Sequence, residues 1–228
     1  MPTKRPSLSR TNHRCILILS AQIGFRLTQG ALLVAWYAMA ESRHPLDARK
    51  TRPLEGGPAF SLGNRLVRLL WTAAWLLLAR WTPPPLHGWR RLVLRAFGAR
   101  IGPGAMVYAS VKIWLPANLE LGPHVMVGPG VRLYNQGRIT VGERTVISQR
   151  AHICASTHDV RDPHFQLVVR PIAIGPGCWV AAEAFVGPGV TMAARSVLGA
   201  RGALFRDTEA DGIYQGNPAV KVKQRDTA

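Results

Sequence analysis

Residues 174–204 read IGPGCWVAAEAFVGPGVTMAARSVLGARGAL, and a large aliphatic residue recurs at every sixth position of this stretch. These residues are Ile174, Val180, Val186, Met192, Leu198 and Leu204. A period of six matches neither the roughly 3.6-residue repeat of a helix nor the alternation of a long strand. It predicts short strands separated by turns and stacked into a solenoid, where each unit buries one side chain against its equivalents in neighbouring coils.

The same pattern extends over residues 101–208. The earlier large positions are all aliphatic as well: Ile101, Val107, Ile113, Leu121, Val127, Leu133, Val141, Ile147 and Ile153. The residue four places after each large position is never larger than valine, and glycine and proline often mark the corners, where sharp turns need them. Three units make one coil, so we expect a parallel β-helix of about five coils. A β-sandwich would space its strands about 8–12 residues apart and would be less strict.

The repeat breaks at three places, and a solenoid carries its insertions on the surface. The step is eight residues from Ile113 to Leu121 and again from Leu133 to Val141, which predicts two small bulges. From Ile153 to Ile174 the step is 21, which is one unit plus an excursion of 15 residues. We expect the inserted segment, residues 154–173, to be a functional loop.

Charge is distributed unevenly along the 228 residues, whose formal net charge is +17. Residues 1–100 contain 16 Lys and Arg against 3 Asp and Glu, whereas the remainder contains 13 against 9. This asymmetry predicts an anionic partner for the first half. The three cysteines, Cys15, Cys154 and Cys178, have no metal-like spacing, so we expect reduced thiols and a cytoplasmic protein.

Residues 1–50 pair basic residues with an apolar run from Cys15 to Phe25. Polar residues interrupt that run, and Ala38-Met39-Ala40 lies too far from it, which argues against an export signal. We expect an extension without assigned function, either disordered or outside the native protein. At the other end, residues 209–228 are expected to be a C-terminal tail.

Residues 51–100 predict two helices. Ser61 is a candidate N-cap for an apolar helix over residues 66–81, Pro83-Pro84-Pro85 ends it, and an amphipathic stretch with Trp89 and Arg90 follows. Two readings stay open: a helical cap over the first coil, and a segment at residues 60–98 lying on an anionic membrane surface. No nucleic-acid-binding motif accompanies the arginines, and tryptophan and leucine between them suit lipid better.

The repeat resembles that of the hexapeptide-repeat acyltransferases. Glu55-Gly56-Gly57-Pro58 through Asn64-Arg65, with the Trp-rich stretch after it, resembles the colanic acid acetyltransferase (WcaF-like) branch over residues 54–224. The resemblance implies a left-handed parallel β-helix, a homotrimer and acetyl-CoA as co-substrate, without a metal. It also implies O-acetylation of a sugar hydroxyl in surface polysaccharide biosynthesis. From the reduced cysteines and the basic, Trp-rich helical segment, we expect the protein in the cytoplasm, peripherally at the inner membrane.

The loop histidine is the expected catalytic base. A free alcohol is a poor nucleophile near neutral pH, and imidazole is suited to removing its proton. The resemblance assigns this role to His158 in Thr-His-Asp. Asp159 or Asp162 would orient the imidazole or bind the sugar, and the sequence does not choose between them. In the second bulge, Asn135 is expected to face the acceptor.

The resemblance also indicates where acetyl-CoA binds, in a groove between neighbouring subunits. Trp179, Ala182 and Ala200 would line the pantetheine arm, and Arg206 would pair with the CoA phosphates. Relatives often carry Thr-Lys where this chain has Phe205-Arg206, so a hydroxyl contact is absent. The closing motif of the family, Gly216-Asn217-Pro218-Ala219, places Asn217 and Pro218 in the same site.

Three alternatives remain. A zinc enzyme on this fold would need three converging histidines, but His124 and His152 occupy different positions of the repeat. A non-catalytic scaffold is the second, because a fold does not specify a function. The third keeps the acetyltransferase and changes the hydroxyl acceptor.

Overall fold

The computed structural model describes residues 44–226. The expectations for the extension at residues 1–50 and for Cys15 therefore lie largely outside the described residues. Within residues 44–226, no helix combines the length and the apolar character that crossing a bilayer requires.

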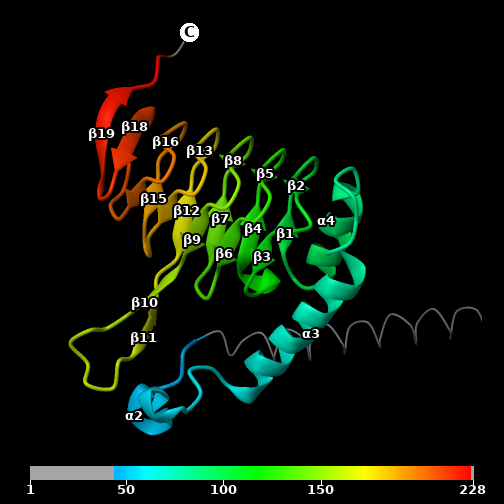
Figure 1. Cartoon of the computed structure of the whole chain (residues 1–228), viewed down its shortest axis with the longest axis vertical. Coiled ribbons are helices and arrows are strands. Elements are labelled where there is room, and N and C mark those ends of the chain that lie inside the picture. The colour runs from blue at the N-terminus through cyan, green and yellow to red at the C-terminus, as the bar shows by residue number, and fades with distance from the viewer. Residues whose placement is uncertain (1–43, 227–228) are drawn as a thin grey trace, which may run out of the picture. The chain divides into compact units, whose positions relative to one another are not determined.

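The described chain is built around a three-sided parallel β-helix, in which each coil gives one short strand to each of three sheets (Figure 1). Sheet A contains β1 (Arg100–Ile101), β4 (Leu119–Leu121), β7 (Ile139–Val141), β12 (Ile172–Ile174) and β15 (Thr191–Met192). Sheet B contains β2 (Met106–Val107), β5 (Met126–Val127), β8 (Val146–Ile147), β13 (Trp179–Val180), β16 (Val197–Leu198), β18 (Gly212–Gly216) and β19 (Ala219–Gln224). Sheet C contains β3 (Lys112–Ile113), β6 (Arg132–Tyr134), β9 (His152–Cys154), β14 (Phe185–Val186) and β17 (Ala203–Leu204). Residues 100–204 thus form five coils, and the predicted solenoid is confirmed.

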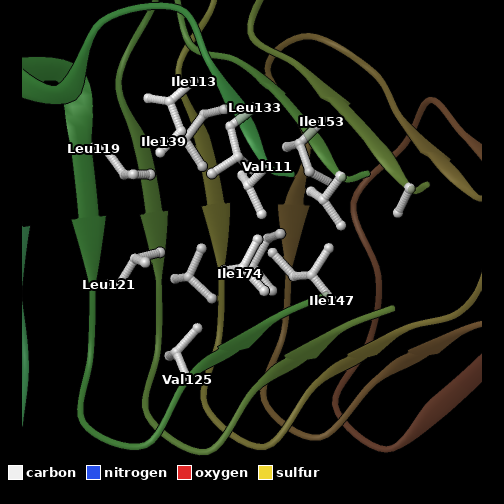
Figure 2. Packing of buried hydrophobic residues seen from close by; sticks show 14 of the residues in the cluster. Val111, Ile113, Leu119, Leu121, Val125, Leu133, Ile139, Ile147, Ile153 and Ile174 are labelled. Atoms are coloured by element: carbon white, nitrogen blue, oxygen red, sulfur yellow. The ribbon is translucent and has the colours of Figure 1, made fainter. Parts of the chain in front are cut away.

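The core is the ladder of large residues that the six-residue period predicted. All fifteen positions are buried, none with more than 8% of its surface exposed. Strands pair in register, so Val127 lies between Val107 and Ile147 on neighbouring coils. Figure 2 shows Ile147 and Ile153 among the side chains in the space that the strands enclose. Burial of each such side chain contributes about 1.5–3 kcal/mol, which makes this ladder the main source of stability.

The two eight-residue steps form bulges that stack on each other. The first contains the 3₁₀ helix η2 (Pro116–Asn118). The Nδ2 atom of Asn118 donates to the carbonyl oxygens of Asn135 (3.1 Å) and Gln136 (2.8 Å) in the second. The bulges therefore satisfy each other's backbone groups and leave the registers of the sheets intact.

The excursion after β9 is an antiparallel hairpin of β10 (Ser156–His158) and β11 (Leu167–Val169). It leaves sheet C and returns to sheet A, where β12 resumes pairing with β7 in register, Ile172 opposite Ile139. The hairpin therefore projects from the wall without displacing it (Figure 1).

Two helices precede the solenoid. In α3 (Leu62–Leu78), the Ser61 hydroxyl accepts from the Asn64 N–H (3.3 Å), as an N-cap does. The indole of Trp71 donates to the Ile113 carbonyl (2.8 Å), which fixes α3 to the end of β3. The second helix, α4 (His87–Ala96), packs against β1 and β2 and buries Val93 and Leu94 over the first coil.

Short elements complete the described chain. The segment before α3 contains α2 (Ala48–Thr51) and the 3₁₀ helix η1 (Pro53–Glu55). At the other end, β18 extends sheet B parallel to β16, and β19 folds back antiparallel to β18. Residues 212–224 of the expected tail are thus a β-hairpin on the last coil.

Candidate functional site

His158 ends β10, and its ring is held by a residue on the other side of the hairpin. Its Nδ1 atom lies 2.8 Å from the backbone carbonyl oxygen of Phe165. The two rings stack with centroids 4.1 Å apart and an angle of 13° between their planes. Phe165 has a φ of 55°, in the left-handed region that a bulky residue rarely adopts. Such strain is found where the surroundings demand a particular geometry, here a carbonyl turned toward the imidazole.

This contact fixes the tautomer of His158. A carbonyl oxygen only accepts hydrogen bonds, so Nδ1 must carry the proton and donate it. The other nitrogen, Nε2, is then unprotonated in the neutral ring and able to take a proton. The arrangement is the one a general base needs.

Neither aspartate orients the imidazole in this structure. One carboxylate oxygen of Asp159 accepts from the N–H of Arg161 (2.9 Å), and one of Asp162 accepts from the N–H of His164 (2.9 Å). Both are therefore side chains that close local turns at the hairpin tip. The backbone carbonyl of Phe165, which the sequence did not single out, holds the position expected of a carboxylate.

Gln166 ties the hairpin to the segment before α3. Its Oε1 accepts from the Ala48 N–H (2.7 Å), and its Nε2 donates to the carbonyl oxygens of Leu46 and Leu167 (3.0 Å each). The His158 loop is thus anchored at a point close to its tip.

A separate groove of about 560 Å³ follows the outer face of sheet B. Trp179, Ala182 and Ala200, the three residues expected beside the pantetheine arm, all line it. Trp179 is 48% exposed, and its indole donates to the Ser148 hydroxyl (2.9 Å), which anchors the ring to the preceding coil. Arg225 lines the same groove and supplies a cation.

The chemistry of this groove fits a thin amphipathic chain with phosphates at one end. Alanines and Gly199 at the corners leave the backbone within reach of an amide-bearing arm, the indole offers an apolar plane, and the guanidinium offers a charge. These features match acetyl-CoA, for which Trp179, Ala182, Ala200 and Arg225 would supply contacts.

Three other residues expected at the cofactor lie outside the groove. Arg206 is exposed after β17 and is not among the groove residues. Asn217 and Pro218 form the exposed turn between β18 and β19, joined by a cis peptide bond. None of the hairpin residues lines the groove either, so one chain alone does not bring His158 to Trp179.

Asn135 belongs to the wall. It is fully buried, its Oδ1 accepts from the N–H groups of Trp114 (3.0 Å) and Leu115 (3.2 Å), and its Nδ2 donates to the Leu115 carbonyl. Its hydrogen bonds are used by the neighbouring bulge, so the expected contact with an acceptor is not available to this side chain. Its neighbour Gln136 has an unpaired Oε1, which no sequence pattern indicated.

The described part of the chain offers no metal centre, since no three His, Cys, Asp or Glu side chains of residues 44–226 converge. Cys178 is buried in the wall, where burial raises the pKa of its thiol. Cys154 is partly buried and free.

No protein-family model matches the chain. Among curated relatives, the protein described as colanic acid biosynthesis acetyltransferase WcaF of Escherichia coli K12 is 42% identical over 166 residues, covering 73% of this chain and 91% of the relative. The galactoside O-acetyltransferase of the same organism is 21% identical and covers 59% of this chain and 68% of the relative.

Solved structures agree on the fold. A hexapeptide-repeat acetyltransferase from Vibrio cholerae, complexed with acetyl coenzyme A, superposes with a TM-score of 0.67 at 19% identity, covering 73% of this chain and 91% of that one. Galactoside acetyltransferase in complex with coenzyme A gives 0.66 at 19% identity, covering 73% and 84%. The β-helix is therefore the left-handed one that the family resemblance implied. With the identity to WcaF over most of both chains, the protein belongs to the WcaF-like family of hexapeptide-repeat acetyltransferases, which use acetyl-CoA.

Proposed function

We propose that this acetyltransferase transfers the acetyl group of acetyl-CoA to a sugar hydroxyl in the biosynthesis of a surface polysaccharide. The observation that carries the proposal is His158, whose Nδ1 is engaged by the Phe165 carbonyl while Nε2 remains available. The identity to WcaF supports the pathway.

The reaction we propose is a direct transfer. Nε2 of His158 removes the hydroxyl proton as the oxygen attacks the thioester carbonyl, and the imidazolium then protonates the leaving thiolate. The Phe165 carbonyl stabilises the imidazolium through Nδ1–H, as a carboxylate does in other triads. A backbone N–H would stabilise the oxyanion. No nucleophilic Ser or Cys is required.

We propose a homotrimer in which His158 of one subunit meets the Trp179 groove of the next. The separation of these two features within one chain supports this assembly, because the hairpin projects outward and does not contribute to its own groove. A trimer would build three equivalent sites.

The test is acceptor-dependent release of CoA across a panel of nucleotide sugars and oligosaccharides. His158→Ala should lower turnover by about 10²–10⁴-fold, the usual contribution of a general base. His164→Ala, on the same hairpin, is the matched control and should retain activity. A folded His158→Ala protein with undiminished turnover would refute the assignment. If no acceptor in the panel stimulated CoA release and the protein did not bind CoA, the alternative of a non-catalytic scaffold would be favoured.

We also propose that the protein works in the cytoplasm, peripherally on the inner membrane, through the outer face of α3. This face carries three leucines that are 56–72% exposed: Leu70, Leu76 and Leu77. Residues 56–119 contain no Asp or Glu but eight Lys and Arg. A second copy would bring like charges together, whereas an anionic lipid surface complements both features.

Co-flotation of the full chain with vesicles tests this attachment. Binding to vesicles containing phosphatidylglycerol should exceed binding to phosphatidylcholine alone and should weaken with salt, which screens charge. Leu70→Gln with Leu77→Gln should release the protein, while Val220→Gln with Val222→Gln, exposed apolar positions on β19, should not. The membrane attachment would be refuted if the protein did not bind vesicles at low salt, or if the two leucine substitutions on α3 left the binding unchanged.

A further inference from the structure

Unpartnered buried polar atoms gather in one region of the described chain. Within residues 44–226 they belong to four residues: Asn64, Arg68, Gln136 and His152. Asn64 and Arg68 lie one turn apart on α3, whereas Gln136 and His152 belong to the second bulge and to β9. An unpaired buried polar group costs about 1–3 kcal/mol, so such a concentration calls for an explanation.

Two aromatic residues, Trp114 and Tyr134, contact three of these four. The Arg68 guanidinium lies over the ring of Trp114, 4.5 Å from its centroid. The Gln136 Nε2 donates to the Tyr134 hydroxyl (2.9 Å), and the Tyr134 ring lies 6.3 Å from that of His152. The hydroxyl oxygen of Tyr134 is thus an acceptor for Gln136, which leaves its own proton to donate elsewhere.

The space between α3 and the outer face of sheet C is hollow on both sides of Trp114. One hollow of about 570 Å³ includes Arg65 and Arg68, and one of about 240 Å³ includes Lys112, Arg132 and Tyr134. The larger one falls within the range of about 300–1,000 Å³ typical of ligand pockets. We call the two hollows together the α3 cleft.

The α3 cleft is positively charged. Its lining includes four Lys and Arg side chains and no Asp or Glu. None of the ion pairs among residues 44–226 involves Arg68, although its guanidinium is partly withdrawn from water and burial lowers its pKa. A half-buried cation with free donors is suited to a carboxylate or phosphate brought by a ligand.

The α3 cleft also lies beside the root of the catalytic hairpin. Tyr134 pairs with Cys154 at the end of β9, and the Ala155 N–H donates to the Tyr134 carbonyl (3.1 Å). Three residues later the chain reaches His158. The cleft therefore lies where an acceptor approaching the base can be held.

We propose that the α3 cleft binds the acceptor as an acidic saccharide. Arg68 pairs with the carboxylate or phosphate of the sugar, the sugar ring packs against Trp114 and Tyr134, and its hydroxyls exchange hydrogen bonds with the Tyr134 hydroxyl and with Gln136 after rotation of its amide. This assignment rests on the proposed function and names the acceptor class and its specificity residues.

Saturation-transfer NMR on the full chain without acetyl-CoA tests the cleft independently of catalysis. The probes are methyl β-glucuronoside, glucose 1-phosphate and methyl β-glucoside. At least one anionic sugar should bind about tenfold or more tightly than the neutral glucoside, the effect of one charge-assisted contact. Binding of the glucuronoside alone would identify a uronic acid, and binding of the phosphate alone a sugar phosphate.

Three variants make the result specific. Arg68→Gln should abolish the preference for the anionic sugar, and Gln136→Glu, similar in size, should repel it. Arg80→Gln, beyond the end of α3, should leave it unchanged, with thermal melts confirming the fold of each. Equal binding of the neutral sugar, unchanged binding by Arg68→Gln, or no binding of either anionic sugar at tens of millimolar would overturn the assignment. If acetyl transfer depends on His158 while binding ignores Arg68, this inference fails and the proposed function stands.

Discussion

Arg90 offers a sharp test of how the helical segment is attached to the solenoid. The side chain is fully buried and has no carboxylate partner among the described residues. Its Nε donates to the Val107 carbonyl (2.6 Å), and its Nη1 to the Thr82 hydroxyl (2.8 Å) and the Pro83 carbonyl (2.9 Å). Its Nη2 donates to the Pro84 carbonyl (2.6 Å). One guanidinium thus joins the turn between α3 and α4 to strand β2.

We predict that Arg90→Met destabilises the fold by about 3–5 kcal/mol. Hydrogen bonds to a charged group contribute about 1.5–3 kcal/mol each, so four would give about 6–12 kcal/mol before other terms. Burying the guanidinium costs several kcal/mol, which offsets about half of that sum. The same burial lowers the pKa of Arg90. Methionine removes both terms and takes the guanidinium donors away from four acceptors, of which the Val107 carbonyl still has His87 Nδ1 within 3.0 Å.

Urea denaturation followed by far-UV circular dichroism, at one protein concentration, measures the difference. The matched control is Arg91→Met, which removes a single hydrogen bond to the Ala105 carbonyl (2.9 Å) and should cost about 1 kcal/mol. If Arg90→Met unfolds within about 1 kcal/mol of the native protein, desolvation cancels the hydrogen bonds and the reasoning fails.

Three further predictions concern the groove, the ladder and the outer face of sheet C. Trp179→Ala should raise KM for acetyl-CoA about tenfold with little change in kcat, by initial rates; a fall in kcat alone would contradict the groove assignment. Ile147→Ala, at a fully buried position, should lower the free energy of unfolding by about 2–5 kcal/mol, as measured by urea denaturation. A decrease below about 1 kcal/mol would contradict this, because it would mean that neighbouring side chains fill the cavity. The pKa of His152 is lowered, first by burial and then by the positive charge of Arg132. The folded state therefore favours the neutral ring. Its contribution to stability is complete above the pKa of histidine in the unfolded chain, about 6.5, and is lost as the pH falls through the lowered pKa of the folded state. Melting temperature should therefore drop less between pH 7 and pH 5 in His152→Gln than in the native protein, and equal drops would refute this reading.

The wall of the solenoid was predictable because its physics is local and periodic. Each coil buries one aliphatic residue on each of its three sides and then turns a corner. The spacing alone therefore predicts that Ile147 and Val180 point into the core. Among the small residues that lie four places after each large position, only Ala117 and Thr157 are not buried. They follow Ile113 and Ile153, the positions after which the period breaks. Irregular spacing thus marked irregular structure correctly.

The contacts around the site were not predictable, because they join residues with no fixed spacing. The carbonyl that orients His158 comes from Phe165 through a left-handed backbone conformation, which no residue type announces. Asn135 and Gln136 are neighbours of similar chemistry. The Asn135 amide is hydrogen-bonded to the bulge about 20 residues earlier, whereas the Oε1 atom of Gln136 has no hydrogen-bond partner. Only the stacking of two coils distinguishes them.

The hairpin that carries His158 leaves the wall after Cys154 and rejoins it at Ile172 with both strand registers unbroken. Its ends are therefore fixed by the lattice and not by its own length or sequence. Loop closure costs only about 0.6 kcal/mol for each doubling of length, so a longer or different hairpin can be installed at little expense to folding. In the proposed mechanism, the coils would hold the acetyl donor, and the exchangeable hairpin would present the base. New acceptors can be reached by grafting hairpins between Cys154 and Ile172 while the coils stay unchanged.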